Sequence, residues 1–318
     1  MSKYLVTGGA GFIGSHLVEQ LLDNGDSVVV LDNFSSGHEE NLSFAAQKKT
    51  AGFYQLIKGD IRDYKICLEA SQGVDYVLHQ AALRSVPKSM ENPHEYNEVN
   101  IDGTLNMLEA ARQCAVKRFV FASSSSVYGD TKQFPERESD YPLLISPYAL
   151  TKLAGEFYCR IFSENFGLET VCLRYFNVFG PRQALDDEYA VVIPKFITCL
   201  LDNVAPPIFG NGKQSRDFTF VKNAVKANVL AATTENIKGE VFNVAGGKSI
   251  LILELVEMLN KIAGKLINPE FLPVRQGDVL KTEADISKAQ SLLKFKPDFD
   301  FEQGLKITYN WFNTKSRK

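Results

Sequence analysis

The stretch YLVTGGAGFIG at residues 4–14 is a short apolar run followed at once by a turn rich in glycine. The apolar run predicts a buried strand, and the stretch 13–24, which ends before Gly25, predicts a helix. A second buried strand is expected at 27–31. A strand, a helix and a second strand in this order predict a βαβ unit, which builds parallel sheets covered by helices on both faces.

Further short apolar runs continue this alternation along the chain. They lie at 54–57, 75–78, 118–121 and 170–173, with helical stretches between several of them. After Arg174 the elements become shorter, and glycine and proline interrupt them. We therefore predict an α/β fold, with a Rossmann-type doubly wound parallel sheet in residues 1–176 and a smaller C-terminal lobe in 177–318. The run 241–244 could return to the sheet as a late strand.

Composition and charge exclude several classes of protein. The chain has 318 residues, of which 45% are hydrophobic and 23% charged, as in average soluble proteins, and no apolar run reaches the length of a membrane span. The N-terminus lacks the pattern of a secretory signal, so a cytoplasmic location is expected. A net charge of −3 offers no basic field for nucleic acid. The five cysteines and four histidines show no metal-ligand spacing, so no metal site is predicted.

The glycine-rich turn matches a dinucleotide-binding pattern. Gly9-x-Gly11-x-x-Gly14 lies between a predicted strand and a predicted helix, where backbone amides can meet a pyrophosphate. Asp32 closes the second strand eighteen residues after Gly14, where its carboxylate can accept hydrogen bonds from ribose hydroxyls. A carboxylate there also repels a 2′-phosphate. The pattern alone could be a simple glycine-rich turn, but this context favours NAD over NADP.

A second polar pattern lies in the middle of the chain. Tyr148 and Lys152 form Tyr-x-x-x-Lys, which places both side chains on one face of a helix. A tyrosine hydroxyl has a pKa near 10 and is a poor base at neutral pH, but a nearby ammonium favours its phenolate. The same spacing also occurs where a packed tyrosine sits beside a solvated lysine. The serine-rich segment 123–126 follows a predicted strand that ends at Ala122.

Taken together, these motifs resemble the extended short-chain dehydrogenase/reductase family, whose glycine spacing is also met by Gly8-x-x-Gly11-x-x-Gly14. The resemblance implies that Ser124, Tyr148 and Lys152 are catalytic. It implies cofactor contacts at Gly8, Gly11, Phe12, Ile13, Gly14, Asp32, Asn33, Asp60, Ile61, Ala81, Tyr148, Lys152 and Tyr175. Asp60 could equally cap a helix, and both roles are compatible.

The residues after Ser124 separate the reactions that this family performs. Relatives that dehydrate their sugar carry an Asp-Glu pair there, whereas this chain has Ser125 and Ser126. Dehydration then lacks a general acid for the leaving hydroxyl. Epimerisation at C4 needs no such acid, because NAD takes the hydride and returns it to the other face of the sugar.

Longer blocks resemble the UDP-N-acetylhexosamine 4-epimerases. They are HQAA at 79–82, SVPKS at 85–89, NIDG at 100–103, RYFNVFGPRQ at 174–183, VVIPK at 191–195, SRDF at 215–218 and RQGD at 275–278. The resemblance implies interconversion of UDP-N-acetylglucosamine and UDP-N-acetylgalactosamine, and extends to UDP-glucose and UDP-galactose. It implies substrate contacts at Ser85, Ser124, Tyr148, Asn177, Arg216, Arg275, Asp278 and Thr282.

Several of these substrate residues have a physical rationale. Two arginines, Arg216 and Arg275, suit a diphosphate because guanidinium groups bind phosphate oxygens and stay charged. Ser85 could contact the sugar or merely cap a helix. Thr282 occupies a position where, in resembling epimerases, a bulky tyrosine excludes N-acetylated sugars. A small threonine predicts that the pocket accepts the 2-N-acetyl group, unless Thr282 instead caps a helix starting near Asp285.

Arg84 departs from the family pattern, in which small residues are usual beside the sugar. A cation near the hexose could favour a uronic acid. UDP-glucuronate or UDP-N-acetylglucosaminuronate 4-epimerase is therefore the alternative, followed by a 4-keto-sugar reductase and a non-catalytic NAD-binding regulator.

The family resemblance also implies a homodimer. Relatives pair through two helices per subunit, which here would be 100–111 and 147–162. Candidate contacts, each of which could instead be a core position, are Leu105, Leu108, Leu153, Phe157 and Ile161.

Overall fold

A computed structural model describes residues 1–45, 52–184, 192–274 and 279–316. Its centre is a seven-stranded sheet in the order β11-β6-β5-β4-β1-β2-β3, and every pair of neighbours is parallel. The strands are β1 (Lys3–Thr7), β2 (Ser27–Asp32), β3 (Tyr54–Lys58), β4 (Tyr76–His79), β5 (Arg118–Ser124), β6 (Glu169–Tyr175) and β11 (Glu240–Val244). This order confirms the predicted Rossmann-type α/β fold.

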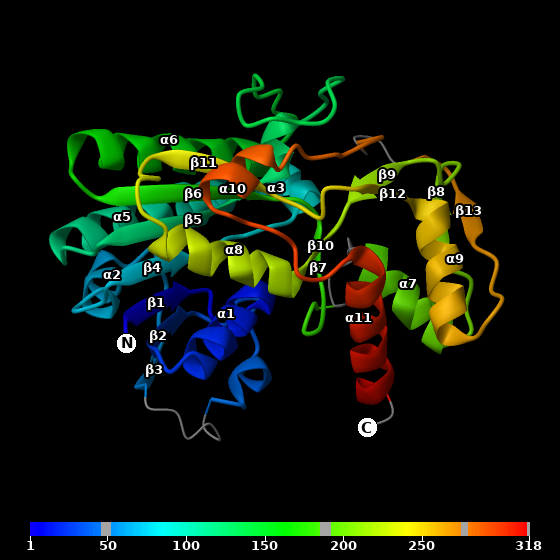
Figure 1. Ribbon diagram of the computed structural model, residues 1–318, viewed down its shortest axis with the longest axis horizontal. Helices are drawn as coiled ribbons and strands as arrows, with labels where there is room; N and C mark the ends of the chain where they lie inside the picture. The colour runs from blue at the N-terminus through cyan, green and yellow to red at the C-terminus, as the bar shows by residue number, and fades with distance from the viewer. Residues whose placement is uncertain (46–51, 185–191, 275–278, 317–318) are drawn as a thin grey trace.

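Helices cover both faces of the sheet (Figure 1). One face carries α1 (Phe12–Asp23) and α8 (Val221–Thr233), and the other carries α2 (Tyr64–Ala70), α5 (Gly103–Gln113) and α6 (Pro147–Asn165). Because both faces are buried, β2 and β5 are buried at every position, as their continuous apolar sequences predict. Each helix contributes one apolar stripe to a core layer.

The order of the strands creates a crevice at one edge of the sheet. From β1 the chain proceeds to β2 on one side, while β4 lies on the other side of β1. Loops after these strands diverge at such a switch point, and ligands of open α/β sheets bind there, beyond the carboxyl ends of the strands. The glycine turn after β1 and the loop after β4 border this crevice.

A smaller lobe lies beyond the crevice. Its helices are α7 (Val192–Leu201), α9 (Ile252–Ala263) and α11 (Phe301–Lys315), which pack around an aromatic cluster that includes Phe179 and Phe220. Three strand pairs complete it: β7 (Val178–Phe179) with β10 (Thr219–Phe220), β9 (Ser215–Asp217) with β12 (Ser249–Leu251), and β8 (Pro207–Phe209) with β13 (Glu270–Leu272). The short elements are η1 (Glu39–Leu42), α3 (Val86–Glu91), α4 (Pro93–Asn97), η2 (Glu98–Asp102), η3 (Ser125–Tyr128) and α10 (Ser287–Leu292).

Residues after 177 do not all belong to this lobe. Helix α8 packs against α1 and the sheet, and β11 pairs with β6 along its whole length. The division into two domains after residue 176 therefore stays a proposal. In that division, α8 and β11 belong with the sheet although they follow residue 176 in the sequence. Within the described ranges, no helix is both long and apolar enough to cross a membrane.

The outer side of α6 is apolar, which bears on the predicted dimer. Phe157 is 55% exposed and Ile161 43% exposed, and Leu150 on the same helix is 53% exposed. Leu105 and Leu153 are partly buried. Leu108 is a wrong choice as a dimer contact, because its side chain is completely buried between α5 and the sheet. The homodimer itself stays a prediction.

Candidate active site

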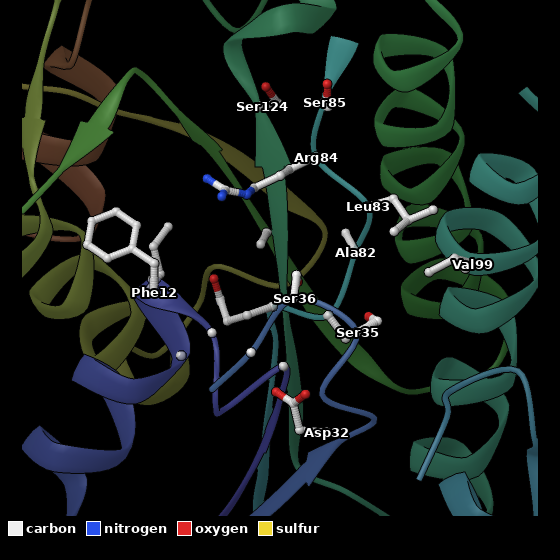
Figure 2. A pocket seen from close by; sticks show the side chains of 18 of the residues that line it. Phe12, Asp32, Ser35, Ser36, Ala82, Leu83, Arg84, Ser85, Val99 and Ser124 are labelled. Carbon is white, nitrogen blue, oxygen red and sulfur yellow. The ribbon is translucent and has the colours of Figure 1, made fainter. Parts of the chain in front are cut away.

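A cavity of about 470 Å³ occupies the crevice and gathers residues from distant parts of the chain. Every cofactor position inferred from the sequence lines it, from Gly8 to Tyr175. Of the inferred substrate positions, Ser85, Ser124, Tyr148 and Asn177 also line it. Figure 2 shows Ser124 and Ser85 at one end of the cavity and Asp32 at the other.

The glycine turn is shaped by close backbone contacts. Gly8 has a φ of +66°, and a Cβ atom at Gly14 would lie 2.1 Å from the Gly8 carbonyl oxygen. Only glycine fits such a contact. Helix α1 begins directly after this turn, and no side chain caps its first amides. These amides remain available for an anion, which the helix dipole also favours.

Asp32 braces this turn from the end of β2. Its Oδ2 accepts a hydrogen bond from the Ala10 amide at 2.8 Å, and its Oδ1 accepts one from the Phe34 amide at 2.8 Å. Burial raises the pKa of Asp32, and these two amides oppose that rise. Each carboxylate oxygen keeps a further lone pair, with which it can accept from a ribose hydroxyl.

Asp60 lies at the same end of the cavity and is tied to its neighbours. Arg62 donates to both carboxylate oxygens, at 3.0 and 2.8 Å, and Asn33 donates to Oδ2 at 2.8 Å. The hydrogen bonds from Arg62 are the main cause that lowers the pKa of Asp60 to about 2. The alternative that Asp60 caps a helix is wrong, because α2 is capped by Asp63.

The residues present fit a dinucleotide. The glycine turn is closed so tightly on its own backbone that a Cβ at Gly14 would collide with it, and the first amides of α1 lie at its end. Arg182, which also lines the cavity, pairs with Glu19 through Nη2 at 2.6 Å, while its buried Nη1 has no hydrogen-bond partner among the residues that the structure describes. An unsatisfied guanidinium N–H near uncapped helix amides suits an anionic ligand. The sequence offered no signal that singled out Arg182.

Tyr148 is buried at the start of α6 and faces Ser124. Helix α6 begins after Ser146, whose hydroxyl accepts from the Ala149 amide at 3.2 Å. Burial raises the pKa of Tyr148, whereas a hydrogen bond with Ser124 and the positive charge of Arg84 lower it. Arg84 therefore supports the phenolate from the opposite wall of the cavity, an effect that the motif spacing did not predict.

Lys152 lies one turn further along α6 and is 5% exposed. Its Nζ donates to the Ala122 carbonyl at 2.8 Å and lies 5.9 Å from the Tyr148 ring centroid. Burial lowers the pKa of Lys152 to about 8, and the negative charge of Glu156 opposes this. Lys152 is thus held beside Tyr148 with its charge supported by a carboxylate one turn away.

That carboxylate belongs to a buried network. Glu156 pairs with Arg174 through two hydrogen bonds, Nε to Oε1 at 2.9 Å and Nη2 to Oε2 at 2.8 Å, and both side chains are almost completely buried. Ser123, next to the proposed catalytic serine, also donates to Glu156. The sequence interpretation missed Glu156. Its spacing, four residues after Lys152, places it on the face of α6 that carries Tyr148.

Ser124 is the last residue of β5, two residues beyond the predicted strand end. The strand extends because Ser123 and Ser124 pair with Arg174 and Tyr175 of β6. The Ser124 hydroxyl accepts from the Ser126 amide at 3.1 Å and lies 3.1 Å from the Ser126 hydroxyl. The segment after Ser124 therefore presents hydroxyl groups to the cavity, and no carboxylic acid.

Ser85 and Asn177 line the cavity from opposite lobes. Ser85 caps α3, because its hydroxyl accepts from the Lys88 amide at 3.3 Å. The capping role is confirmed, and a contact with substrate stays a prediction. Asn177 has a φ of +36° and donates to the Asp217 carbonyl at 3.0 Å and to the Thr282 hydroxyl at 3.1 Å.

Two other inferred substrate residues that the structure describes, Thr282 and Arg216, do not line the cavity. Thr282 lies behind Asn177, and its hydroxyl also accepts from the Asp217 amide at 3.1 Å. The alternative that Thr282 caps a helix is wrong, since α10 begins at Ser287 without a side-chain cap. Arg216, on β9, donates to the Ser215 carbonyl at 2.9 Å. Arg275 and Asp278 lie outside the described residues.

Comparisons with known proteins agree with this geometry. The UDP-N-acetylglucosamine 4-epimerase of Methanobrevibacter ruminantium M1, solved with UDP-N-acetylmuramic acid, is 43% identical, with 99% of both chains covered and a TM-score of 0.93. The UDP-glucuronic acid 4-epimerase of Bacillus cereus, solved with UDP-glucuronic acid and NAD, is 36% identical over 98% of this chain and 99% of that one, with a TM-score of 0.90. A UDP-glucose 4-epimerase of Mycolicibacterium smegmatis is 37% identical over 99% of this chain and 100% of its own.

The family model described as the NAD dependent epimerase/dehydratase family matches residues 4–245. That range contains the sheet, the glycine turn and the Tyr148–Lys152 pair. The relatives above align over almost their full lengths. The chain therefore belongs to the NAD dependent epimerase/dehydratase family and is an enzyme that uses NAD as its cofactor.

Proposed function

We propose that this enzyme interconverts UDP-N-acetylglucosamine and UDP-N-acetylgalactosamine by epimerisation at C4, and that the same pocket takes UDP-glucose and UDP-galactose. The observation that carries the choice of sugar is the contact between Thr282 and Asn177. Asn177 lines the cavity, and the hydroxyl that accepts from its side chain belongs to a small residue. A small side chain behind this wall leaves room for a 2-N-acetyl group.

The proposed chemistry assigns one task to each group at the end of β5 and the start of α6. When bound, NAD supplies the hydride acceptor and donor at C4. Tyr148 removes the proton from the C4 hydroxyl and later returns it, and Ser124 holds the same oxygen by a hydrogen bond. Arg84 is a cation that lowers the pKa of Tyr148. Lys152, whose Nζ lies 5.9 Å from the Tyr148 ring centroid, would add a second positive charge that favours the phenolate. After the 4-keto sugar turns over in the cavity, the opposite face receives the hydride.

The inferred cofactor roles are part of this proposal. The glycine turn would receive the pyrophosphate of NAD, and Asp32 would accept from the adenosine ribose. The bonds of Asp32 to the turn support this role, because they hold the carboxylate at the edge of the cavity. Asn33, Asp60 and Ile61 would lie along the adenine, since they line the same end of the cavity.

A second candidate is a UDP-uronate 4-epimerase, which one observation favours. Arg84 brings a positive charge to the part of the cavity where Tyr148 and Ser124 meet. The Bacillus cereus relative, 36% identical, was solved with UDP-glucuronic acid. A non-catalytic regulator is not favoured, because Ser124, Tyr148 and Lys152 all line one cavity.

The direct test is turnover by the purified, NAD-loaded enzyme. We expect UDP-N-acetylglucosamine to be converted to UDP-N-acetylgalactosamine until the two reach an equilibrium mixture. Proton NMR of the anomeric signals follows this conversion. Absorbance at 340 nm should stay constant, because an epimerase consumes no NADH, whereas a net reductase would. Turnover of UDP-glucuronate alone would replace the first candidate with the second.

The predicted homodimer also belongs here. The stripe Leu150, Phe157 and Ile161 on α6 is exposed at helical spacing, as expected for a helix that packs against a second copy. Sedimentation at micromolar concentration should give twice the chain mass, and Phe157→Glu should reduce it to the monomer. A monomeric mass for the unaltered chain would contradict the dimer.

A further inference from the structure

Arg84 carries N–H donors to which the proposed reaction assigns no partner. It lies in the loop after β4, next to Ser85. Its side chain is exposed within the cavity rather than packed against the protein. Figure 2 shows it extending sideways from the loop towards the side of the cavity where Phe12 lies, below Ser124.

The other cations along the cavity each have at least one partner, although Nη1 of Arg182 has none among the described residues. Arg62 pairs with Asp60 at 2.8 Å, Arg182 pairs with Glu19 at 2.6 Å, and Lys152 donates to Ala122 at 2.8 Å. Arg84 makes no hydrogen bond or ion pair with any described residue. A guanidinium carries five N–H donors in a planar fork that matches a carboxylate or a phosphate. Arg84 is therefore ready to receive an anion from a ligand.

The position of the Arg84 charge indicates which part of the ligand carries the anion. Arg84 and Tyr148 line the same cavity, and the charge of Arg84 helps to lower the pKa of Tyr148, so under the proposed function this charge lies on the side of the cavity where C4 of the sugar would bind. In a hexopyranose the neighbours of C4 are C3 and C5, which carry the O3 and C6 substituents. The diphosphate is attached to C1, across the ring from C4. With C4 at Tyr148, substituents at C6 or O3 would therefore lie on the Arg84 side of the ring, and the diphosphate on the other side.

We propose that Arg84 forms an anion subsite for a carboxylate carried by the hexose at C6 or O3. The inference rests on the proposed function, because it assumes that C4 lies at Tyr148. Combined with the small Thr282, it names the substrate class as UDP-hexoses that bear a carboxylate, acidic N-acetylhexosamines included. A neutral hexose would leave the Arg84 donors to water, so neutral substrates are accepted without an unsatisfied buried charge.

The test uses two pairs of ligands that differ by one acidic group. UDP-glucuronate differs from UDP-glucose at C6, and UDP-N-acetylmuramate differs from UDP-N-acetylglucosamine at O3. Dissociation constants are measured by calorimetry on NAD-loaded Tyr148→Phe enzyme, in which turnover is suppressed, with and without Arg84→Gln. Lys88→Gln is the matched control, since it removes a positive charge from the same segment outside the cavity.

We expect Arg84→Gln to weaken the acidic ligand relative to its neutral partner by about tenfold or more in at least one pair, as for a charge-assisted hydrogen bond. Arg84→Lys should retain part of the preference, and Lys88→Gln should leave both ratios within about twofold. Which pair responds shows whether the carboxylate is carried at C6 or O3.

Two results would overturn the subsite. If Arg84→Gln leaves the ratio of acidic to neutral dissociation constants unchanged in both pairs, Arg84 does not contact the carboxylate. An equal weakening of all four ligands and of UDP alone would make Arg84 a diphosphate contact. Turnover of UDP-N-acetylglucosamine by enzyme with Tyr148 intact is measured separately, so failure of the proposed function is distinguished from failure of the subsite.

Discussion

The two walls of the cavity differ in how firmly their side chains are held. On the wall formed by α6 and the end of β5, Lys152 bonds to Ala122. Behind this wall Glu156 bonds to Ser123 and Arg174, and all of these residues are buried. On the facing wall Arg84 is exposed and without a partner among the described residues. The first wall carries the groups proposed for proton transfer, and the second carries a proposed determinant of the sugar.

This difference suggests how one fold serves several sugars. Breaking a buried ion pair by removing one partner costs about 3 to 5 kcal/mol, so the α6–β5 wall tolerates little change. Exposed substitutions usually change stability by less than about 0.5 kcal/mol, so the facing wall can vary freely. Solved relatives named for N-acetylglucosamine and for glucuronic acid share this fold. The predictions below test the contrast between the two walls.

The largest effect is expected at Glu156. Glu156→Gln leaves Arg174 buried without its counter-charge, so the free energy of unfolding should fall by about 3 kcal/mol, the lower end for a broken buried pair. Urea unfolding measures this. Glu164→Gln, on the same helix in an exposed pair with Arg160, is the control and should change stability by less than about 0.5 kcal/mol.

The same variant should shift the pH dependence of kcat. Lys152 has a pKa lowered to about 8, and the charge of Glu156 opposes that lowering. Without this charge the pKa falls further, so Lys152 loses its proton at lower pH and the alkaline limb of kcat moves to lower pH. Neighbouring His79, whose pKa burial lowers to about 3, stays neutral, and Arg174 stays charged. An unshifted pH profile of kcat would mean that Glu156 has a purely structural role. Glu156→Asp should move the alkaline limb part of the way back towards its original pH.

Tyr148→Phe should fold and retain NAD but lose at least about two orders of magnitude in kcat, the usual scale of general acid–base catalysis. Removing the hydroxyl leaves the buried ring in place, so stability should change little. Ser124→Ala should cost a similar amount or less, because it removes one hydrogen bond to the reacting oxygen. Steady-state turnover with the purified variants measures both, and near-normal turnover by Tyr148→Phe is the outcome that rejects the assignment.

Asp32→Ala should weaken NAD binding by about tenfold or more, since it removes a charged acceptor and the brace of the glycine turn. It should also reduce discrimination against NADP, because no carboxylate would then repel the 2′-phosphate. Asp32→Asn separates the two effects, since an amide oxygen can still accept from one backbone amide. Titration of cofactor-free protein with both dinucleotides measures this, and an unchanged preference would refute the ribose role.

Local patterns predicted much of the molecule. The glycine turn, the Tyr148–Lys152 spacing and the alternating strands lie within short segments, so the sequence alone placed the sheet and the cofactor end of the cavity. The pairing of Glu156 with Arg174 depends on the register between α6 and β6, which no short segment contains. The extension of β5 to Ser124 likewise depends on its pairing with β6. Leu108 was misplaced because an apolar position in a helix does not reveal which side faces the core.

The smallest effect, and the most specific one, is expected at Thr282. Thr282→Tyr would bring a ring into the packed region behind Asn177, with an overpacking strain of about 1 to 3 kcal/mol, or roughly 5-fold to 150-fold. If this region borders the 2-N-acetyl group, kcat/KM should fall much more for UDP-N-acetylglucosamine than for UDP-glucose. Thr282→Ser keeps the hydroxyl that accepts from Asn177 and Asp217, so it should preserve the ratio between the two substrates. Equal losses on both substrates in the tyrosine variant would mean that Thr282 only supports Asn177, and its proposed role in selecting the sugar would be rejected. The roles proposed for the α6–β5 wall would not be affected.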